Sequence, residues 1–76
     1  MREVVTTDGK YRYLGNKLHS DTGPAVELVC GTVMYYQHGK PHRVNGPAIQ
    51  CGNGLCIYYI DGIRLSAEEF SIRTVV

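Results

Sequence analysis

The sequence predicts an all-β fold, an antiparallel meander of repeated β-hairpins with one short C-terminal helix. Three observations support this prediction: an internal repeat of fixed period, glycine-containing turn dipeptides at regular intervals, and a helix-start pattern near the C-terminus. The 76 residues make one domain, 1–76, near the lower size limit for a self-sufficient core. A chain of this size buries only about 60% of its unfolded surface, so a partner or an oligomer is expected.

The repeat decides the architecture. Tyr13, Tyr36 and Tyr59 are 23 residues apart (36−13 and 59−36), and the same offset relates Gly-Pro-Ala-Val-Glu at 23–27 to Gly-Pro-Ala-Ile-Gln at 46–50. A fixed period of this size indicates one supersecondary unit used repeatedly, with neighbouring copies sharing a core. The predicted copies span approximately 8–30, 31–53 and 54–65.

Turn dipeptides divide the copies into hairpins. One series is Asp8-Gly9, Cys30-Gly31 and Asn53-Gly54, and the other is Gly15-Asn16, His38-Gly39 and Asp61-Gly62. Such pairs favour two-residue hairpin loops, because both positions accept a positive φ. The stretches with high β-propensity between these turns are 25–29, 32–37, 48–51 and 55–60.

Two-residue loops would fix the register and separate the two faces of the sheet. They place Leu28 opposite Val33, Val26 opposite Tyr35, Cys51 opposite Cys56, Ile49 opposite Tyr58, Tyr35 opposite His42, and Tyr58 opposite Leu65. Because side chains alternate along a strand, the predicted core face, covered by the helix, collects Val26, Leu28, Val33, Tyr35, His42, Ile49, Cys51, Cys56, Tyr58, Ile60, Ile63 and Leu65. The other face is mixed and collects Ala25, Glu27, Met34, Tyr36, Arg43, Ala48, Gln50, Ile57, Tyr59 and Arg64.

The last segment breaks the repeat. Ser66 and Glu69 have the spacing of a capping box, in which each side chain bonds the backbone amide of the other residue. The pattern predicts a helix at approximately 67–73, with Phe70, Ile72 and Val75 on its apolar side. This helix would be the atypical cap that ends a repeat array.

Residues 35–48 read Tyr-Tyr-x-x-Gly-Lys-x-His-Arg-x-x-Gly-Pro-Ala, and residues 58–70 continue with a second Tyr-Tyr pair and the helix start. Both segments resemble small bacteriophage and other viral repeat proteins that are related in period to MORN repeats. The resemblance covers about residues 8–73. It implies a phage-encoded protein, and the link of MORN repeats to protein assembly and to lipid binding makes either activity possible here. The first copy departs from the unit, because Ser20 stands where Arg43 stands in the second.

Composition and motifs argue against several function classes. The net charge of +1 disfavours a dedicated nucleic-acid binder, and no apolar run reaches the length of a membrane span. Neither end has the pattern of a signal peptide. The three cysteines are an odd number with no Cys-x-x-Cys pair and are interpreted as reduced thiols, so the expected location is the cytoplasm, or the host cytoplasm if the protein is viral. No nucleophile stands beside an oriented base, so we expect no enzyme, no catalytic residues and no cofactor.

The cysteines and histidines have two interpretations each. Cys51 and Cys56 could form a disulfide or half of a metal site, but Leu28 and Val33 occupy the equivalent positions one repeat earlier. We therefore expect reduced, at least partly buried thiols and no metal. His42 could be a metal ligand or a base, but it stands where Leu65 stands one repeat later, and we expect it to be packed or hydrogen-bonded in the sheet.

The feature that folding explains least is a stripe of tyrosines, Tyr13, Tyr36 and Tyr59, with Met34 and Ile57 beside them. Such a stripe could be a second buried layer, or it could be a partner surface, where Tyr, Met and Arg are enriched. We expect a non-enzymatic protein–protein interaction module, an inhibitor or modulator of a host or anti-phage defence protein. The alternatives are a membrane-lipid or nucleic-acid adaptor and a purely structural, self-associating repeat. The expected partner-binding residues are Tyr13, Met34, Tyr36, Arg43, Ile57, Tyr59 and Arg64.

Overall fold

The structure, a computed structural model, describes residues 2–74 of the chain. In this part of the chain, short strands precede a single helix. The strands are β1 (Arg2–Val5), β2 (Gly9–Leu14), β3 (Lys17–Leu18), β4 (Val26–Leu28), β5 (Val33–Met34), β6 (Tyr36–Gln37), β7 (Lys40–Pro41), β8 (Ile49–Gln50), β9 (Cys56–Ile60) and β10 (Ile63–Leu65). The helix, α1, spans Ala67–Thr74.

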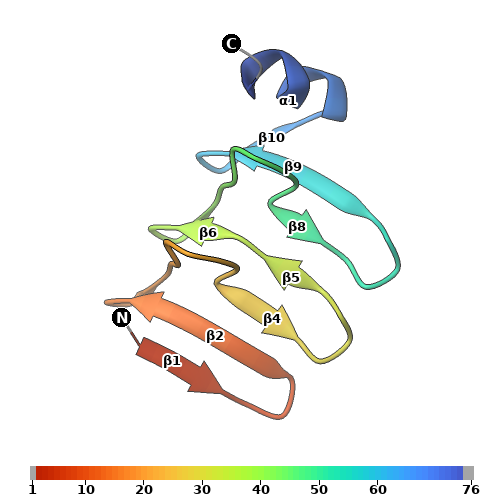
Figure 1. The fold of residues 1–76 in the computed structure, drawn as a ribbon. Coiled ribbons are helices and arrows are strands. Elements are labelled where there is room, and N and C mark those ends of the chain that lie inside the picture. The colour runs from red at the N-terminus through yellow and green to blue at the C-terminus, as the bar shows by residue number, and fades with distance from the viewer. Residues whose placement is uncertain (1, 75–76) are drawn as a thin grey trace.

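The strands form an antiparallel meander, as the sequence predicts. The main sheet has the order β1-β2-β4-β5-β8-β9-β10, with β3 also paired to β2, while β6 and β7 form a separate two-stranded hairpin. Figure 1 shows the hairpins stacked in chain order, from β1 at one end of the molecule to α1 at the other. The array is therefore built mainly from contacts between segments that are close in sequence.

The hydrogen bonds between successive hairpins recur with the period of the sequence repeat. The Ser20 amide donates to the Tyr36 carbonyl (3.2 Å), and the Arg43 amide donates to the Tyr59 carbonyl (3.1 Å). The same offset relates Arg12 N–Ala25 O to Tyr35 N–Ala48 O, His19 N–Arg12 O to His42 N–Tyr35 O, and Gly39 N–Leu18 O to Gly62 N–Pro41 O. Equivalent backbone groups thus make equivalent bonds in successive copies.

The two long hairpins have loops one residue longer than predicted. In the first, the Gly31 amide donates to the Leu28 carbonyl (3.0 Å), and the Leu28 amide donates to the Thr32 carbonyl (2.8 Å). In the second, Gly54 takes the place of Gly31, and these two glycines have φ values of 94° and 97°. The residues before them keep a negative φ, so each loop is a type I turn followed by a left-handed glycine.

This extra residue makes four predicted pairings wrong. Leu28–Val33, Val26–Tyr35, Cys51–Cys56 and Ile49–Tyr58 are replaced by Glu27–Val33, Val26–Met34, Gln50–Cys56 and Ile49–Ile57. A slip of one residue moves side chains to the other face of a sheet. Val26 and Ile49 therefore share a face with Met34 and Ile57, whereas Glu27 and Gln50 lie on the opposite face.

The second series of turns follows the prediction. His38 and Gly39 both have a positive φ (52° and 83°), as do Asp61 and Gly62 (51° and 82°), which is the geometry of a type I′ loop. The pairing of Tyr58 with Leu65 across the Asp61-Gly62 loop is confirmed. The Tyr35–His42 pairing is confirmed by a bond from the His42 amide to the Tyr35 carbonyl (3.0 Å), and Gly15-Asn16 also forms a two-residue loop.

The first hairpin differs from the prediction. Its loop is Thr7-Asp8, because the Thr6 amide donates to the Gly9 carbonyl (2.8 Å). Gly9 lies in β2 instead, where an added Cβ would collide with the Glu27 carbonyl of β4. Glycine is needed here for the close approach of two strands, and β1 adds a strand before the first predicted copy.

α1 caps the last hairpin, and its start is confirmed. The Ser66 amide donates to Glu69 Oε1 (3.0 Å), and the Glu69 amide donates to Ser66 Oγ (3.1 Å). Phe70 packs with Ile60 and Leu65 in a buried cluster against the half-buried Tyr58. Ile72, predicted on the same apolar side of the helix, is instead 69% exposed. Val75, also predicted there, lies outside the described residues.

The burial of several side chains differs from the predicted division into a core face and a mixed face. Val26, Ile60 and Leu65 are buried, but Cys56 and Ile63 are exposed. Ala25 and Ala48, predicted on the mixed face, are fully buried. The helix covers only the last hairpin, so the central copies keep half-buried side chains: Leu28, Val33, Tyr35, His42, Ile49 and Cys51.

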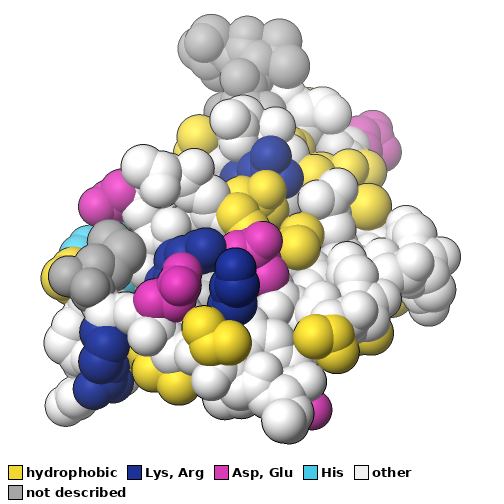
Figure 2. Space-filling model, turned by 60° about the horizontal axis from the view of Figure 1, so that its bottom comes forward, with side chains coloured by type: hydrophobic (Ala, Val, Ile, Leu, Met, Phe, Trp, Pro, Cys, Tyr) yellow, Lys and Arg dark blue, Asp and Glu magenta, His cyan; other side chains and the backbone are white. Residues whose placement is uncertain are grey.

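Two ion pairs connect β2 to its neighbours β1 and β4 at the β1 end of the array. Arg12 Nε donates to Glu3 Oε2 (3.1 Å), and Arg12 Nη1 donates to Glu27 Oε2 (2.7 Å). The hydrogen bond with Glu27, followed by the charges of both carboxylates, raises the pKa of Arg12. Figure 2, a view with this end turned forward, shows basic and acidic side chains side by side between hydrophobic patches.

Candidate interaction surface

The predicted tyrosine stripe is a row in the structure. Tyr13 pairs with Leu18, Tyr36 with Pro41, and Tyr59 with Arg64, so each tyrosine meets the residue five positions after it (18−13, 41−36 and 64−59). All three tyrosines are half-buried. The guanidinium of Arg2 lies over the Tyr13 ring, 5.1 Å from its centroid. The row therefore presents one ring for each hairpin.

An apolar row continues this surface across the main sheet. Val26 pairs with Met34, Met34 with Ile49, and Ile49 with Ile57. Cross-strand partners share a face, and Ile57 precedes Tyr59 by two residues in β9, so this row and the tyrosine Tyr59 lie on the same side. Val26 is buried, and the other three side chains are half-buried.

Nothing in the described chain forms a layer over these two rows. The helix α1 contacts β9 and β10, and it packs against Tyr58, whose side chain alternates with those of Ile57 and Tyr59. The register slip also removes Glu27 and Gln50 from this face. The face is thus more apolar than the sequence predicts, and Arg64 is the charged residue that remains from the predicted set.

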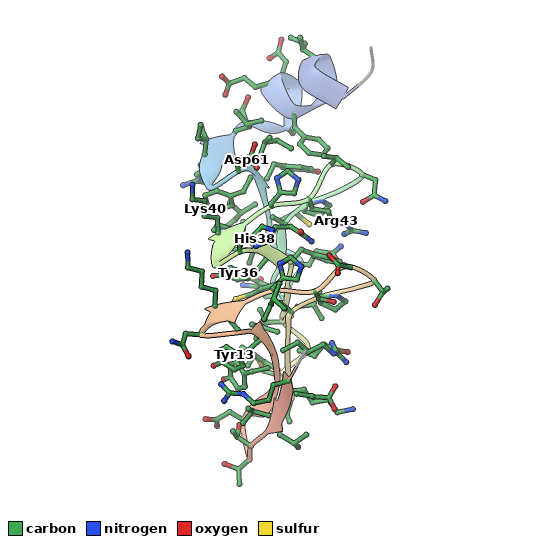
Figure 3. All side chains as sticks on the ribbon, turned by 90° about the vertical axis from the view of Figure 1, so that its left-hand side faces the viewer. Tyr13, Tyr36, His38, Lys40, Arg43 and Asp61 are labelled. Carbon is green, nitrogen blue, oxygen red and sulfur yellow. The ribbon has the colours of Figure 1, made fainter. Side chains whose placement is uncertain are left out.

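Arg43 is the predicted partner-binding residue that the structure places elsewhere. Its guanidinium stacks on the ring of Tyr35, 3.9 Å from the centroid, and donates to Asn45 Oδ1 (3.1 Å) and to the Pro47 carbonyl (3.2 Å). Figure 3 shows Arg43 on one side of the stack and Tyr13 and Tyr36 on the other. The chain leaves strand geometry at 42–48, so strand alternation does not apply to Arg43.

A hollow next to the tyrosine row offers an anchoring point. It has a volume of about 540 Å³ and is lined by Tyr13, Leu18, Lys17, His38 and Lys40, together with loop residues. The stem of Lys17 lies over Gly39, 3.4 Å from where a Cβ would stand. Interfaces commonly bury an aromatic anchor in such a hollow and surround it with polar groups.

Two histidines tie successive hairpins together. The amide of His38 donates to His19 Nδ1 (3.0 Å), and the amide of Asp61 donates to His42 Nδ1 (2.9 Å). The expectation that His42 is hydrogen-bonded in the sheet is confirmed. The bond formed by His19 was not predicted. The pattern that indicates it is that both histidines recur with the period of the repeat and precede the residue that donates to them by the same interval (38−19 and 61−42).

A second hollow lies at the corner that contains His42. It has a volume of about 420 Å³, and its lining includes Tyr35, His42, Arg43 and Asn45 on one side and Asp21 and Thr22 from the preceding copy on the other. Its lining mixes a cation, a carboxylate, an imidazole ring and an aromatic face. This hollow was not predicted from the sequence.

The cysteines lie apart from both hollows. All three are free thiols, and Cys51 is half-buried, as expected. The expectation that Cys56 is partly buried is wrong, because the slipped register pairs it with Gln50 at an exposed position. A hydrogen bond with the Thr32 hydroxyl, at 3.5 Å, lowers the pKa of the exposed Cys30 thiol.

Among residues 2–74, no three His, Cys, Asp or Glu side chains gather in a group that could hold a metal ion. The described helix is not long and apolar enough to cross a membrane. Comparison with known proteins adds no relative: the chain matches no protein-family model, no curated protein and no solved structure.

Proposed function

We propose that this chain is a non-enzymatic protein-interaction module and that the tyrosine row, with the apolar row beside it, binds the partner. The observation that carries the proposal is the unlayered sheet face on which Tyr13, Tyr36 and Tyr59 recur in equivalent positions beside Met34 and Ile57. Contiguous half-buried apolar surface of this kind is typical of interaction sites.

The residue types on this face favour a protein partner. Tyr and Met are enriched at the centres of protein interfaces, and tyrosine buries a large area with only two side-chain torsions to fix. Arg64, opposite Tyr59, supplies a charged group at the end of the row. We propose, on the resemblance to phage repeat proteins, that the partner is a host or anti-phage defence protein that this chain inhibits or modulates.

The test is the double variant Tyr36→Ala/Tyr59→Ala. Its control is Leu14→Ala/Leu55→Ala, which removes two exposed apolar side chains (45% and 56% exposed) outside the row. We expect both variants to fold, as judged by circular dichroism. We expect the tyrosine variant alone to lose partner binding or self-association, by about 2 kcal/mol, or roughly 30-fold.

The readouts are affinity capture from host lysate with the wild type and both variants, and sedimentation velocity for self-association. A tyrosine variant that unfolds would show that the row is core. A variant that folds and still binds would place the interface elsewhere. Binding of the wild type to anionic liposomes or single-stranded nucleic acid that collapses between low and physiological salt would replace the protein partner with a charged surface or polymer.

A further inference from the structure

The two histidine corners follow the same backbone path but carry different side chains. The amides of His19 and His42, the amides of Ser20 and Arg43, and the carbonyls of Ala25 and Ala48 make equivalent backbone bonds, and each histidine accepts at Nδ1 from the next turn. Because Nδ1 accepts a hydrogen bond from an amide, the ring proton of each neutral histidine is assigned to Nε2. Each corner therefore has one N–H donor, at Nε2, to satisfy.

The first corner satisfies this donor with its own carboxylate. His19 Nε2 donates to Asp21 Oδ1 at 2.8 Å, and the His19 side chain is only 3% exposed. In the second corner Val44 stands at the position of Asp21. His42 Nε2 has no hydrogen-bond partner within residues 2–74, and the side chain is 22% exposed.

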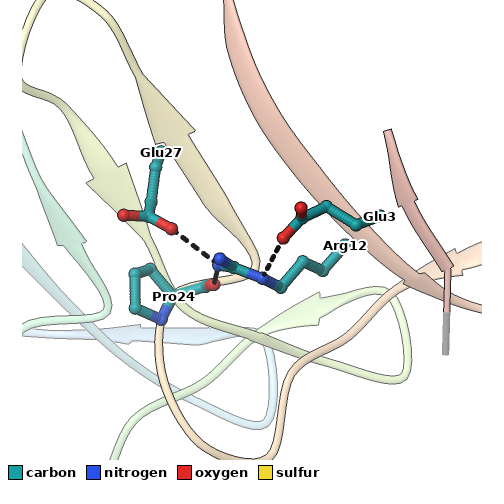
Figure 4. A network of polar contacts seen from close by, with 4 residues as sticks. All are labelled: Glu3, Arg12, Pro24 and Glu27. Atoms are coloured by element: carbon teal, nitrogen blue, oxygen red, sulfur yellow. Dashed lines mark hydrogen bonds and ion pairs between the residues drawn. The ribbon is translucent and has the colours of Figure 1, made fainter. Parts of the chain in front are cut away.

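The arginine at each corner differs in the same way, although the two do not hold equivalent positions, because Tyr35 corresponds to Arg12 and Ser20 corresponds to Arg43. Arg12 and Arg43 each donate Nη1 to a proline carbonyl, Pro24 at 2.7 Å and Pro47 at 3.2 Å, and these prolines are equivalent. Figure 4 shows that Arg12 is also held by two carboxylates, those of Glu3 and Glu27.

The other acceptors of Arg43 are neutral. Its Nε donates to Asn45 Oδ1, and Gln50 stands at the position equivalent to Glu27. The guanidinium charge of Arg43 is thus not neutralised by a carboxylate within the described part of the chain. Among residues 2–74, the second corner thus has no carboxylate at His42 Nε2 and none at the Arg43 guanidinium. The Asp61 carboxylate approaches the other ring nitrogen, with its Oδ1 3.4 Å from His42 Nδ1.

Among the residues that the structure describes, His42 Nε2 has no hydrogen-bond partner and the charge of Arg43 is not neutralised, and both side chains line the hollow of about 420 Å³. We propose that this hollow binds a carboxylate group, which accepts from His42 Nε2–H and from the Arg43 guanidinium as the acids of the first copy do. Asp21 also lines the hollow, so its charge favours a singly charged ligand over a doubly charged phosphate. Such a carboxylate is carried by a glutamate or aspartate side chain of a protein or by a small free acid.

The site is independent of the proposed tyrosine interface, because it lies on the other side of the stack. Failure of the carboxylate proposal therefore leaves the tyrosine interface standing, and the reverse also holds.

The test is an NMR titration of the ¹⁵N-labelled protein at constant ionic strength. The probes are sodium acetate, inorganic phosphate, the peptide acetyl-Gly-Glu-Gly-amide and its glutamine counterpart. We expect saturable shifts at the His42 ring and the Arg43 guanidinium with acetate and the glutamate peptide, with a Kd on the order of millimolar, and none with the glutamine peptide. Tighter binding of the glutamate peptide than of acetate identifies a protein side chain as the ligand, and the opposite order identifies a small free acid.

Three variants sharpen the test. His42→Asn keeps an acceptor for the Asp61 amide but removes the Nε2–H donor, and Arg43→Gln removes the charge. Each should weaken carboxylate binding about tenfold or more, as expected for a charge-assisted hydrogen bond. Val44→Asp rebuilds the internal acid of the first corner and should abolish binding. A control, Lys10→Gln, removes one positive charge from β2, outside both hollows, and should leave the Kd within about twofold.

The proposal is overturned by equal shifts with the glutamate and glutamine peptides, by tighter binding of phosphate than of acetate, or by unchanged affinity in folded His42→Asn and Arg43→Gln. Because these two variants do not depend on Val44→Asp, the test stands even if the added aspartate prevents folding.

Discussion

The last hairpin and the tyrosine row carry similar side chains, but they are covered to different extents. Tyr58 packs beneath Phe70, with ring centroids 4.7 Å apart, beside the buried Ile60 and Leu65. Tyr59, the next residue, points to the opposite side of β9 and pairs with Arg64 on a face without a covering layer. Both rings are half-buried, and composition does not show which of the two a helix packs against. The position of α1 does.

The largest loss of stability is expected when the ring that covers the last hairpin is removed. Phe70→Ala should lower the free energy of unfolding by about 3 kcal/mol, because it leaves a cavity over Tyr58 and Ile60. Tyr59→Ala, on the uncovered face, should cost less than half as much. Urea denaturation followed by circular dichroism measures both. Equal losses would mean that the two regions do not differ in packing.

The bonds that tie His19 and His42 to the next turns extend the comparison to the corners. His19→Ala removes a ring that is bonded at both nitrogens and nearly fully buried, and it should cost about 2 kcal/mol. His42→Ala removes one bond from a more open ring and should cost about 1 kcal/mol. The same denaturation series compares them. A larger cost at His42 would contradict the view that the first corner is the more closed of the two.

The smallest effect concerns how α1 begins. Ser66→Ala should cost about 1 kcal/mol through the loss of the bond to the Glu69 amide. Ser71, in the same helix, bonds the Ala67 carbonyl instead of capping an end, so Ser71→Ala should cost less than about 0.5 kcal/mol. An unchanged denaturation midpoint in Ser66→Ala would show that the capping box does not stabilise the cover over the last hairpin.

The sequence predicts the parts of this fold that depend on local chemistry. The type I′ turns at His38-Gly39 and Asp61-Gly62 follow from residues that tolerate a positive φ, and the start of α1 follows from the capping box. The longer loops at 29–31 and 52–54 were missed because a glycine after an Asn or Cys fits either a two-residue loop or the last position of a three-residue loop. Only the pairing of neighbouring strands decides between them.

The three tyrosine rings of the candidate surface were predicted, but the side chains that surround them were not. Tyr13, Tyr36 and Tyr59 were identified from the repeat alone, whereas Glu27 and Gln50 were assigned to the wrong face by the one-residue slip. The role of Arg43 depends on the path of 42–48 outside the strands, and no periodic pattern describes such a segment. The second-corner hollow depends on how residues 20–23 and 42–45 lie against each other, which the repeat pattern does not describe.

The recurrence of equivalent backbone bonds has a consequence for how such a chain can change in length. Each copy bonds only to its neighbours, and two strands at about 4.8 Å spacing add roughly 10 Å to the stack. Duplication of a whole repeat unit in the middle of the chain would create one more rung and leave every existing bond in place. It would also add one more tyrosine to the row. Copy number can therefore set the length of this face, while the sequence of each copy sets its chemistry.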